Sequence, residues 1–92
     1  MLSIHKFPVH VRDLFELRLP KGAEFLSVQQ QYDATQSWWV VDLEQPKRSR
    51  FFRVRGTGHE FVRKAGETEK FLGTFQLNGG TFVGHLFEVL EA

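Results

Sequence analysis

Apolar and polar residues alternate with a period of two along most of this 92-residue chain, and this pattern does most to limit the folds open to it. A period of two places successive side chains on opposite faces of a β-strand, whereas an amphipathic helix has a period of roughly 3.6 residues. The alternation is clear from Phe15 to Leu19 and from Glu24 to Tyr32, and no stretch has a convincing helical period. The sequence therefore predicts an all-β chain.

The strands are expected to form a single domain, residues 1–92, built as a small antiparallel β-sandwich or a partly closed barrel of about six to seven strands. Within Glu24–Tyr32, the side chains of Leu26 and Val28 are expected to face the core. Asn78-Gly79-Gly80 predicts a hairpin turn before the closing strand, because these residues tolerate positive φ.

Composition excludes or disfavours several classes of protein. The chain has no cysteine, so it has neither a disulfide framework nor a thiolate metal site. Its four histidines match no standard set of metal ligands, and no metal or other cofactor is expected. No apolar run approaches the roughly 20 residues of a membrane-spanning helix, and the first residues have no signal-peptide pattern. We therefore expect a cytoplasmic protein that does not bind a membrane.

Charge is unevenly distributed along the chain. The segment from Lys47 to Lys64 holds seven basic residues and a single acid, Glu60, out of 12 Lys+Arg and 11 Asp+Glu in all. The formal net charge of +1 therefore combines a segment at +6 with a remainder at −5. Because a local excess of positive charge attracts anions, this segment is the first place to expect a ligand.

Two arginines of this segment are the strongest candidates for an anion site. Arg53 and Arg55 lie two residues apart on a predicted strand, so their side chains share one face at a spacing of about 6 to 7 Å. Two guanidinium groups at that spacing suit neighbouring phosphates, or one phosphate and one carboxylate, which they would hold by bidentate hydrogen bonds. The alternative is that the arginines only form a solvated face of the strand.

A glycine-bracketed turn follows the arginines directly. Gly56, Thr57 and Gly58 could direct successive backbone N–H groups at one anion, and Thr57 and His59 add a hydroxyl and a ring donor. No Walker loop is present, and the glycines could equally do no more than shape a turn. The thirteen residues from Thr57 to Glu69 have no strand pattern, and irregular stretches of this length are often functional.

Two further residues are candidates for contact with a ligand. His85 shares a strand face with three apolar residues of the closing strand, so we expect it to be partly buried and hydrogen-bonded, in a position to line a ligand site. Trp38 and Trp39 are adjacent and must point to opposite faces of their strand. One of them is expected in the core. The other is expected to lie at a subunit interface or to stack on a base, and Trp38 is taken as this second tryptophan and as a candidate ligand contact.

Enzymatic catalysis is not indicated. The chain has no cysteine nucleophile and no Gly-x-Ser-x-Gly elbow, and its four serines lack a recognisable histidine and aspartate context. The acidic residues are expected mostly at exposed positions, which does not favour paired carboxylates for acid–base chemistry. We therefore expect no catalytic residues.

Motifs along nearly the whole chain, from Ile4 to Glu88, carry a resemblance to a known family. They are Ile4-His5-Lys6-Phe7-Pro8, Leu19-Pro20-Lys21-Gly22-Ala23, Leu26-Ser27-Val28-Gln29, Gly56-Thr57-Gly58-His59, Gly73-Thr74-Phe75-Gln76 and the closing Gly79-Gly80-Thr81-Phe82-Val83-Gly84-His85-Leu86-Phe87-Glu88. The chain resembles a family of small phage and prophage proteins of about this length and of unknown function. The loop Glu60–Lys64 is more basic than is usual in that family.

The resemblance implies a phage protein that acts in the cytoplasm of a bacterial host, and it does not imply a reaction. Many short phage proteins counter host defence. Our first hypothesis is accordingly a non-enzymatic homo-oligomer that sequesters a nucleotide-derived immune signal, either a cyclic oligonucleotide or an ADP-ribose derivative. A chain of this size has little interior left for a pocket of roughly 300 Å³, so the pocket would lie between subunits.

Two other functions remain open from the sequence. A protein-interaction module that inhibits a host defence protein would show an exposed aromatic patch and no affinity for small anions. A nucleic-acid-binding accessory protein would use the basic segment Lys47–Lys64, but the net charge of +1 and the acidic remainder do not favour it.

Overall fold

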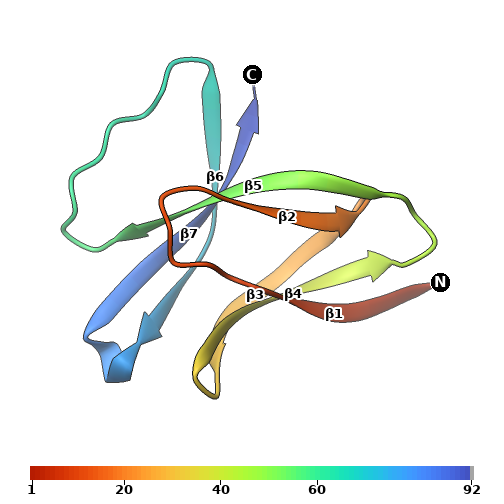
Figure 1. Cartoon of the computed structure of the whole chain (residues 1–92), viewed down its shortest axis with the longest axis horizontal. Helices are drawn as coiled ribbons and strands as arrows, with labels where there is room; N and C mark the ends of the chain where they lie inside the picture. Colours follow the sequence, from red (N-terminus) through yellow and green to blue (C-terminus); the bar gives the residue numbers. More distant parts are fainter. Residues whose placement is uncertain (92) are drawn as a thin grey trace.

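The computed structural model describes residues 1–91, which fold into seven strands in two antiparallel sheets (Figure 1). The strands are β1 (Leu2–Pro8), β2 (Phe15–Pro20), β3 (Glu24–Gln31), β4 (Ala34–Asp42), β5 (Lys47–Gly56), β6 (Glu67–Leu77) and β7 (Phe82–Glu91). One sheet has the order β1-β4-β3 and the other the order β2-β5-β7-β6. The predicted all-β sandwich is confirmed, and the two sheets do not close into a barrel.

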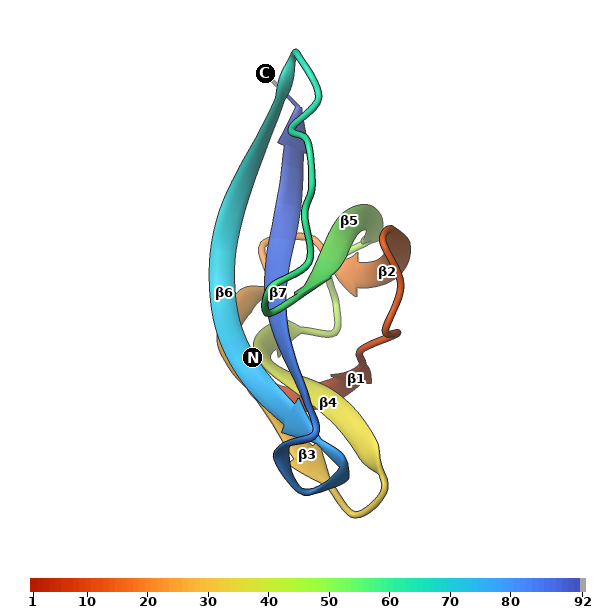
Figure 2. The same cartoon turned by 90° about the vertical axis from the view of Figure 1, so that its left-hand side faces the viewer.

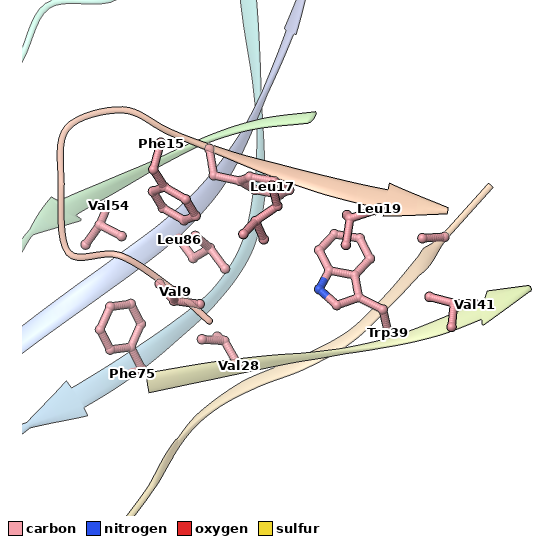
Figure 3. Packing of buried hydrophobic residues seen from close by; sticks show 12 residues of the cluster. Val9, Phe15, Leu17, Leu19, Val28, Trp39, Val41, Val54, Phe75 and Leu86 are labelled. Carbon is pink, nitrogen blue, oxygen red and sulfur yellow. The ribbon is translucent and has the colours of Figure 1, made fainter. Parts of the chain in front are cut away.

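The core lies between the inner faces of the two sheets. Alternate residues of β2, β4 and β5 face inward, so that Trp39 and Val41 of β4 meet Leu19 of β2 and Phe52 of β5. Figure 3 shows Trp39 reaching from β4 toward Leu17 and Leu19 on the opposite sheet. Trp39 is fully buried and its indole donates to the hydroxyl of Ser37 at 2.8 Å. Trp39 is thus the tryptophan that was expected in the core.

The two sheets approach closely along β3 and β6, where a glycine allows the contact. A Cβ atom on Gly73 would lie 2.8 Å from a methyl group of Val28, so a larger residue here would push the sheets apart. Gly73 also follows a register irregularity in β6, between Phe71 and Gly73. The edges of β3 and β6 are therefore covered by one another.

Two details of the sequence-based prediction are wrong. A bulge between Phe25 and Ser27 shifts the alternation of β3 by one residue, so Leu26 is exposed and Phe25 packs on the core instead. The irregular stretch is also shorter than expected, because β6 begins at Glu67. The loop that joins β5 to β6 spans residues 57–66 and runs back along the molecule to the start of β6 (Figure 2).

The predicted hairpin before the closing strand is confirmed. Asn78–Gly80 forms a single 3-10 turn between β6 and β7, with positive φ at all three residues.

In the part of the chain that the structure describes, no helix has the length and apolar character needed to cross a membrane.

Candidate functional site

The predicted arginines lie on the outer face of the four-stranded sheet, the face turned away from the core. In the register of β5 and β7, Arg53 is opposite Phe87 and Arg55 is opposite His85, and residues opposite each other share a face. Phe87 is in turn opposite Phe71 of β6. This outer face therefore carries aromatic and charged side chains together.

Arg53 is bound on both sides by carboxylates of β6. Its guanidinium donates to Glu69 at 3.1 Å and to Glu67 at 3.0 and 3.3 Å. Arg53 is buried. The hydrogen bond to Glu67 raises the pKa of Arg53, burial acts in the opposite direction, and the carboxylate of Glu69 adds to the increase. Arg53 is therefore a fixed cation within the protein.

Arg55 shares the second of these carboxylates and also stacks on an aromatic ring. Its Nε and a terminal nitrogen donate to Glu69, with Nε at 3.2 Å. Its guanidinium carbon lies 3.7 Å from the ring centroid of Phe61, which belongs to the loop 57–66. A cation so close to an aromatic face is attracted by the ring quadrupole, so Arg55 helps to hold the loop against the sheet.

The carboxylate of Glu69 is the centre of this cluster. Its side chain is only 2% exposed, between two arginine side chains that are 10% and 12% exposed. Burial acts to raise the pKa of Glu69, but hydrogen bonds and charges from Arg55 and Arg53 lower it overall. Two arginines and two glutamates thus form a charge-balanced network, which we call the Arg–Glu cluster (Arg53, Arg55, Glu67 and Glu69).

Neither sequence-based interpretation of the two arginines matches the cluster. They are not solvated, and their guanidinium groups face protein carboxylates rather than an open anion site. A third arginine of the basic segment, Arg50, is paired as well, on the core side of β5. It donates to both oxygens of Glu88 at 2.6 and 2.8 Å and lies 4.8 Å from the ring of Trp39. Three of the seven basic residues of the segment are therefore paired with carboxylates in the fold.

The glycine turn uses its own backbone donors. The N–H of Thr57 donates to Val83 at 3.1 Å and that of His59 to Gly56 at 3.1 Å, so these two groups do not converge on an anion. A Cβ atom on Gly56 would lie 2.6 Å from the ring of His59, which packs over it, and Gly58 has a φ of 81°. Both glycines are thus explained by the shape of the turn.

His85 joins the turn to the sheet. Its Nε2 is 2.7 Å from the hydroxyl of Thr57 and its Nδ1 is 2.9 Å from the hydroxyl of Thr74 in β6. Both hydroxyls can donate or accept, so they satisfy the ring in either tautomer. The expectation that His85 is partly buried and hydrogen-bonded is confirmed.

Trp38 does not join these residues. It lies in β4 of the other sheet, on the face opposite to the buried Trp39, where it is half-buried. Its neighbours in register are Lys6 of β1 and Ser27 of β3. The structure thus brings together Arg53, Arg55, Gly56, Thr57, Gly58, His59 and His85 around the end of β5, and it places Trp38 apart from them.

An open groove lies beside the turn, between the segment that precedes β2 and the loop 57–66. It has a volume of about 340 Å³ and is lined by Arg12, Arg55, Gly56, His59 and Phe61 among others. In the described structure, no hydrogen bond or ion pair engages the side chain of Arg12 or His59. Arg12 is therefore a cation available to a ligand, although the sequence did not indicate it.

Exposed aromatic rings surround the Arg–Glu cluster. Phe51, Phe61 and Phe71 are 43%, 50% and 55% exposed, and Phe71 packs edge-on against Phe87 at 5.5 Å. Leu14 lies near two of these rings, because it lines one hollow with Phe51 and another with Phe61. We call this surface the outer aromatic face (Leu14, Phe51, Phe61, Phe71, Phe87 and Val89).

Several residues of this region were not predicted from the sequence to belong to the site. Glu67 and Glu69 were assigned to an irregular stretch. Their spacing of two residues matches that of Arg53 and Arg55, and this match could have indicated ion pairs between two strands. No sequence pattern indicated that Thr74 contacts His85. The acidic residues were expected at exposed positions, but the side chains of Glu69 and Glu88 are buried.

Among residues 1–91, no group of three or more His, Asp or Glu residues is arranged to hold a metal ion.

Comparison with known proteins gives a family but no relative of known function. No curated protein and no solved structure matches the chain significantly. One family model matches residues 1–92, and it is described as a domain of unknown function. Since the match covers the full length of the sequence, the chain belongs to the DUF7352 family.

Proposed function

We propose that this chain is a non-catalytic protein-binding module that docks through its outer aromatic face. The observation that carries the proposal is a set of three half-exposed phenylalanines: Phe51 and Phe71 on the outer face of the sheet, and Phe61 on the loop that packs on this face through Arg55. Exposed aromatic side chains that gather on one surface mark sites of protein–protein contact, and aromatic residues dominate the energetics of such contacts.

The Arg–Glu cluster supports this function. Since its charges are balanced internally, the face can be covered by an apolar surface without leaving an unpaired charge. Arg55 of the cluster also stacks on Phe61, which helps to hold that ring in place and reduces the ordering needed on binding.

The chemistry of the partner follows from the rim of this face. Arg63 and Lys64 are exposed at the edge of the loop 57–66, and Lys64 lines the same hollow as Leu14. The partner in this proposal is therefore a protein with an apolar patch bordered by carboxylates. Given the resemblance to phage and prophage proteins, we take that partner to be a bacterial host defence protein, bound and inhibited in the cytoplasm.

Truncation of one exposed ring tests the proposal. The wild-type chain would be used to capture a binding partner from bacterial lysate, and the partner would be purified. The dissociation constant of this partner would then be measured for the wild type, Phe71→Ala and Leu26→Ala. We expect Phe71→Ala to weaken binding by about 30-fold, as for an interface hot spot of about 2 kcal/mol. Leu26 is a matched control because it is 48% exposed, is apolar and lies on the other sheet. Equal affinities of the two variants would contradict docking at the outer aromatic face.

A small anionic ligand is a second candidate, favoured by the groove of about 340 Å³ at the end of β5. That volume lies within the range of ligand pockets, and Arg12 and His59 offer donors that are not engaged elsewhere in the described structure. In this version of the sequestration hypothesis, Arg12 holds the phosphate of a cyclic oligonucleotide or ADP-ribose derivative, while Arg53 stays within the Arg–Glu cluster.

Thermal shift against a panel of cyclic oligonucleotides and ADP-ribose isomers tests this candidate. A ligand at 100 times its dissociation constant should stabilise the protein by about 2.7 kcal/mol. We expect Arg12→Ala to abolish the shift, and Phe71→Ala to leave it unchanged. The absence of a shift with every compound would remove this candidate and leave protein docking.

A further inference from the structure

The first strand of the sheet β1-β4-β3 is a free edge, and its residues are exposed on both faces. Leu2 and Ile4 of β1 are 71% and 62% exposed, and six of the seven residues of this strand are exposed. An apolar edge strand in this condition is a template for pairing with another strand.

The hydrogen bonding of β1 shows which of its backbone groups are free. The N–H of Val9 donates to Thr35 at 3.0 Å, so Val9 and Thr35 form a hydrogen-bonded pair of the ladder. Hydrogen-bonded and non-hydrogen-bonded pairs alternate in an antiparallel ladder, and the register of β1 and β4 has no irregularity. The N–H and C=O groups of Leu2, Ile4 and Lys6 therefore point away from β4, toward the open edge.

The other three sheet edges do not offer such a template. β3 and β6 cover one another where Gly73 meets Val28. β2 is short, carries the charged residues Glu16 and Arg18 on its exposed face, and ends at Pro20. Charges, short length and proline are devices that block the pairing of edge strands.

The outer face of the same sheet is apolar next to this edge. Leu2 and Ile4 of β1 share that face with Trp38 and Val40 of β4, because Ile4 is opposite Val40 and Lys6 is opposite Trp38. A strand added to the edge would extend this surface, whose apolar residues lie between Lys6 at one end and Asp42 at the other.

We propose that β1 pairs with β1 of a second copy of this chain, antiparallel and about a two-fold axis at Ile4, so that two sheets become one sheet of six strands. In this register the free backbone groups of Leu2, Ile4 and Lys6 meet those of the partner's Lys6, the partner's Ile4 and the partner's Leu2. The inference is independent of the proposed function, because the outer aromatic face lies on the other sheet and stays open.

Charge complementarity favours a second copy of this chain as the strand that pairs with the free edge of β1. Leu2 is opposite Asp42 of β4, so the register places the partner's Lys6 two strand spacings, about 10 Å, from Asp42. That distance is within reach of a lysine side chain, and the two-fold axis makes the contact twice. Within one chain, Lys6 donates to Gln31 at 2.6 Å and Asp42 lies 3.8 Å from the exposed N-terminal amine of Met1; solvent can replace both contacts.

Sedimentation equilibrium over a concentration series tests the pairing with three kinds of protein. The wild type should be dimeric at about 100 µM. Ile4→Pro removes only an N–H that points to the open edge, so the fold should stay intact while the dimer weakens about tenfold or more. Ile4→Val is the matched control and should dimerise like the wild type. Melting curves of each variant would verify that the monomer is folded.

A charge exchange between two copies tests the register. Lys6→Asp and Asp42→Lys each place like charges together, so each variant alone should dimerise about tenfold more weakly than the wild type. An equimolar mixture of the two should recover wild-type affinity as a heterodimer, because every Asp then faces a Lys. A monomeric wild type, or an Ile4→Pro variant that dimerises like Ile4→Val, would overturn the proposal. Failure of the mixture to recover would overturn the register at Ile4.

Discussion

Replacing Glu69 by glutamine should remove about 3 kcal/mol from the free energy of unfolding, a large share of the roughly 5 kcal/mol expected for a chain of this size. The amide keeps the volume of the carboxylate but leaves the buried guanidinium groups of Arg53 and Arg55 without their shared counter-charge. Urea unfolding followed by circular dichroism would measure the loss.

Glu69 also makes the free energy of unfolding depend on pH. The pKa of Glu69 is lower in the folded protein than in the unfolded chain, so the folded state favours the ionised form. Its contribution is fully present above the pKa of an unfolded glutamate, about 4.3, and is lost as the pH falls through the lower folded pKa. Midpoints of urea unfolding between neutral pH and pH of about 2 should therefore fall less steeply for Glu69→Gln than for the wild type.

A matched exposed residue distinguishes the cluster from a general charge effect. Glu44 is 87% exposed, and Glu44→Gln changes the net charge by the same amount as Glu69→Gln. We expect Glu44→Gln to unfold like the wild type at every pH. If the two variants behaved alike, the Arg–Glu cluster would have no special role in stability.

The adjacent tryptophans should respond in opposite ways to truncation. Trp39→Ala removes a fully buried ring that packs on Phe52 and Phe25, and should cost about 4 kcal/mol, enough to leave much of the protein unfolded. Trp38 is half-buried on the outer face of the same strand, so Trp38→Ala should cost far less and leave the fold intact.

Circular dichroism and intrinsic fluorescence would measure both effects. The fluorescence of Trp38→Ala should come from the buried Trp39 alone and shift to shorter wavelength, and urea should reverse that shift. Trp39→Phe keeps part of the core contact, so it replaces Trp39→Ala in these measurements if Trp39→Ala does not fold. Similar losses of stability in Trp38→Ala and Trp39→Ala would contradict the assignment of their faces.

The class of fold could be predicted because a period of two has one dominant structural meaning. Alternation placed Phe15, Leu17 and Leu19 correctly on one face, and adjacency placed Trp38 and Trp39 on opposite faces. The inward assignment of Leu26 failed because a bulge breaks the period, and no residue in that stretch marks a bulge.

The candidate site was harder to predict because it depends on which strands are neighbours. Arg53 and Arg55 were correctly placed on one face of a strand, but their partners Glu67 and Glu69 lie two strands away, across β7. A charge count along the sequence therefore suggested a basic surface where the fold makes ion pairs. The groove at Arg12 also depends on the approach of two loops, which local patterns do not encode.

The strand order also determines when this protein can fold. β7 lies between β5 and β6, so it is central in its sheet although it is the last strand in the sequence. During synthesis, β5 and β6 leave the ribosome before the strand that joins them, and Arg50 of β5 is exposed before its partner Glu88 is made. The four-stranded sheet must then form after β7 has been synthesised, and a chain truncated before Phe82 should not fold.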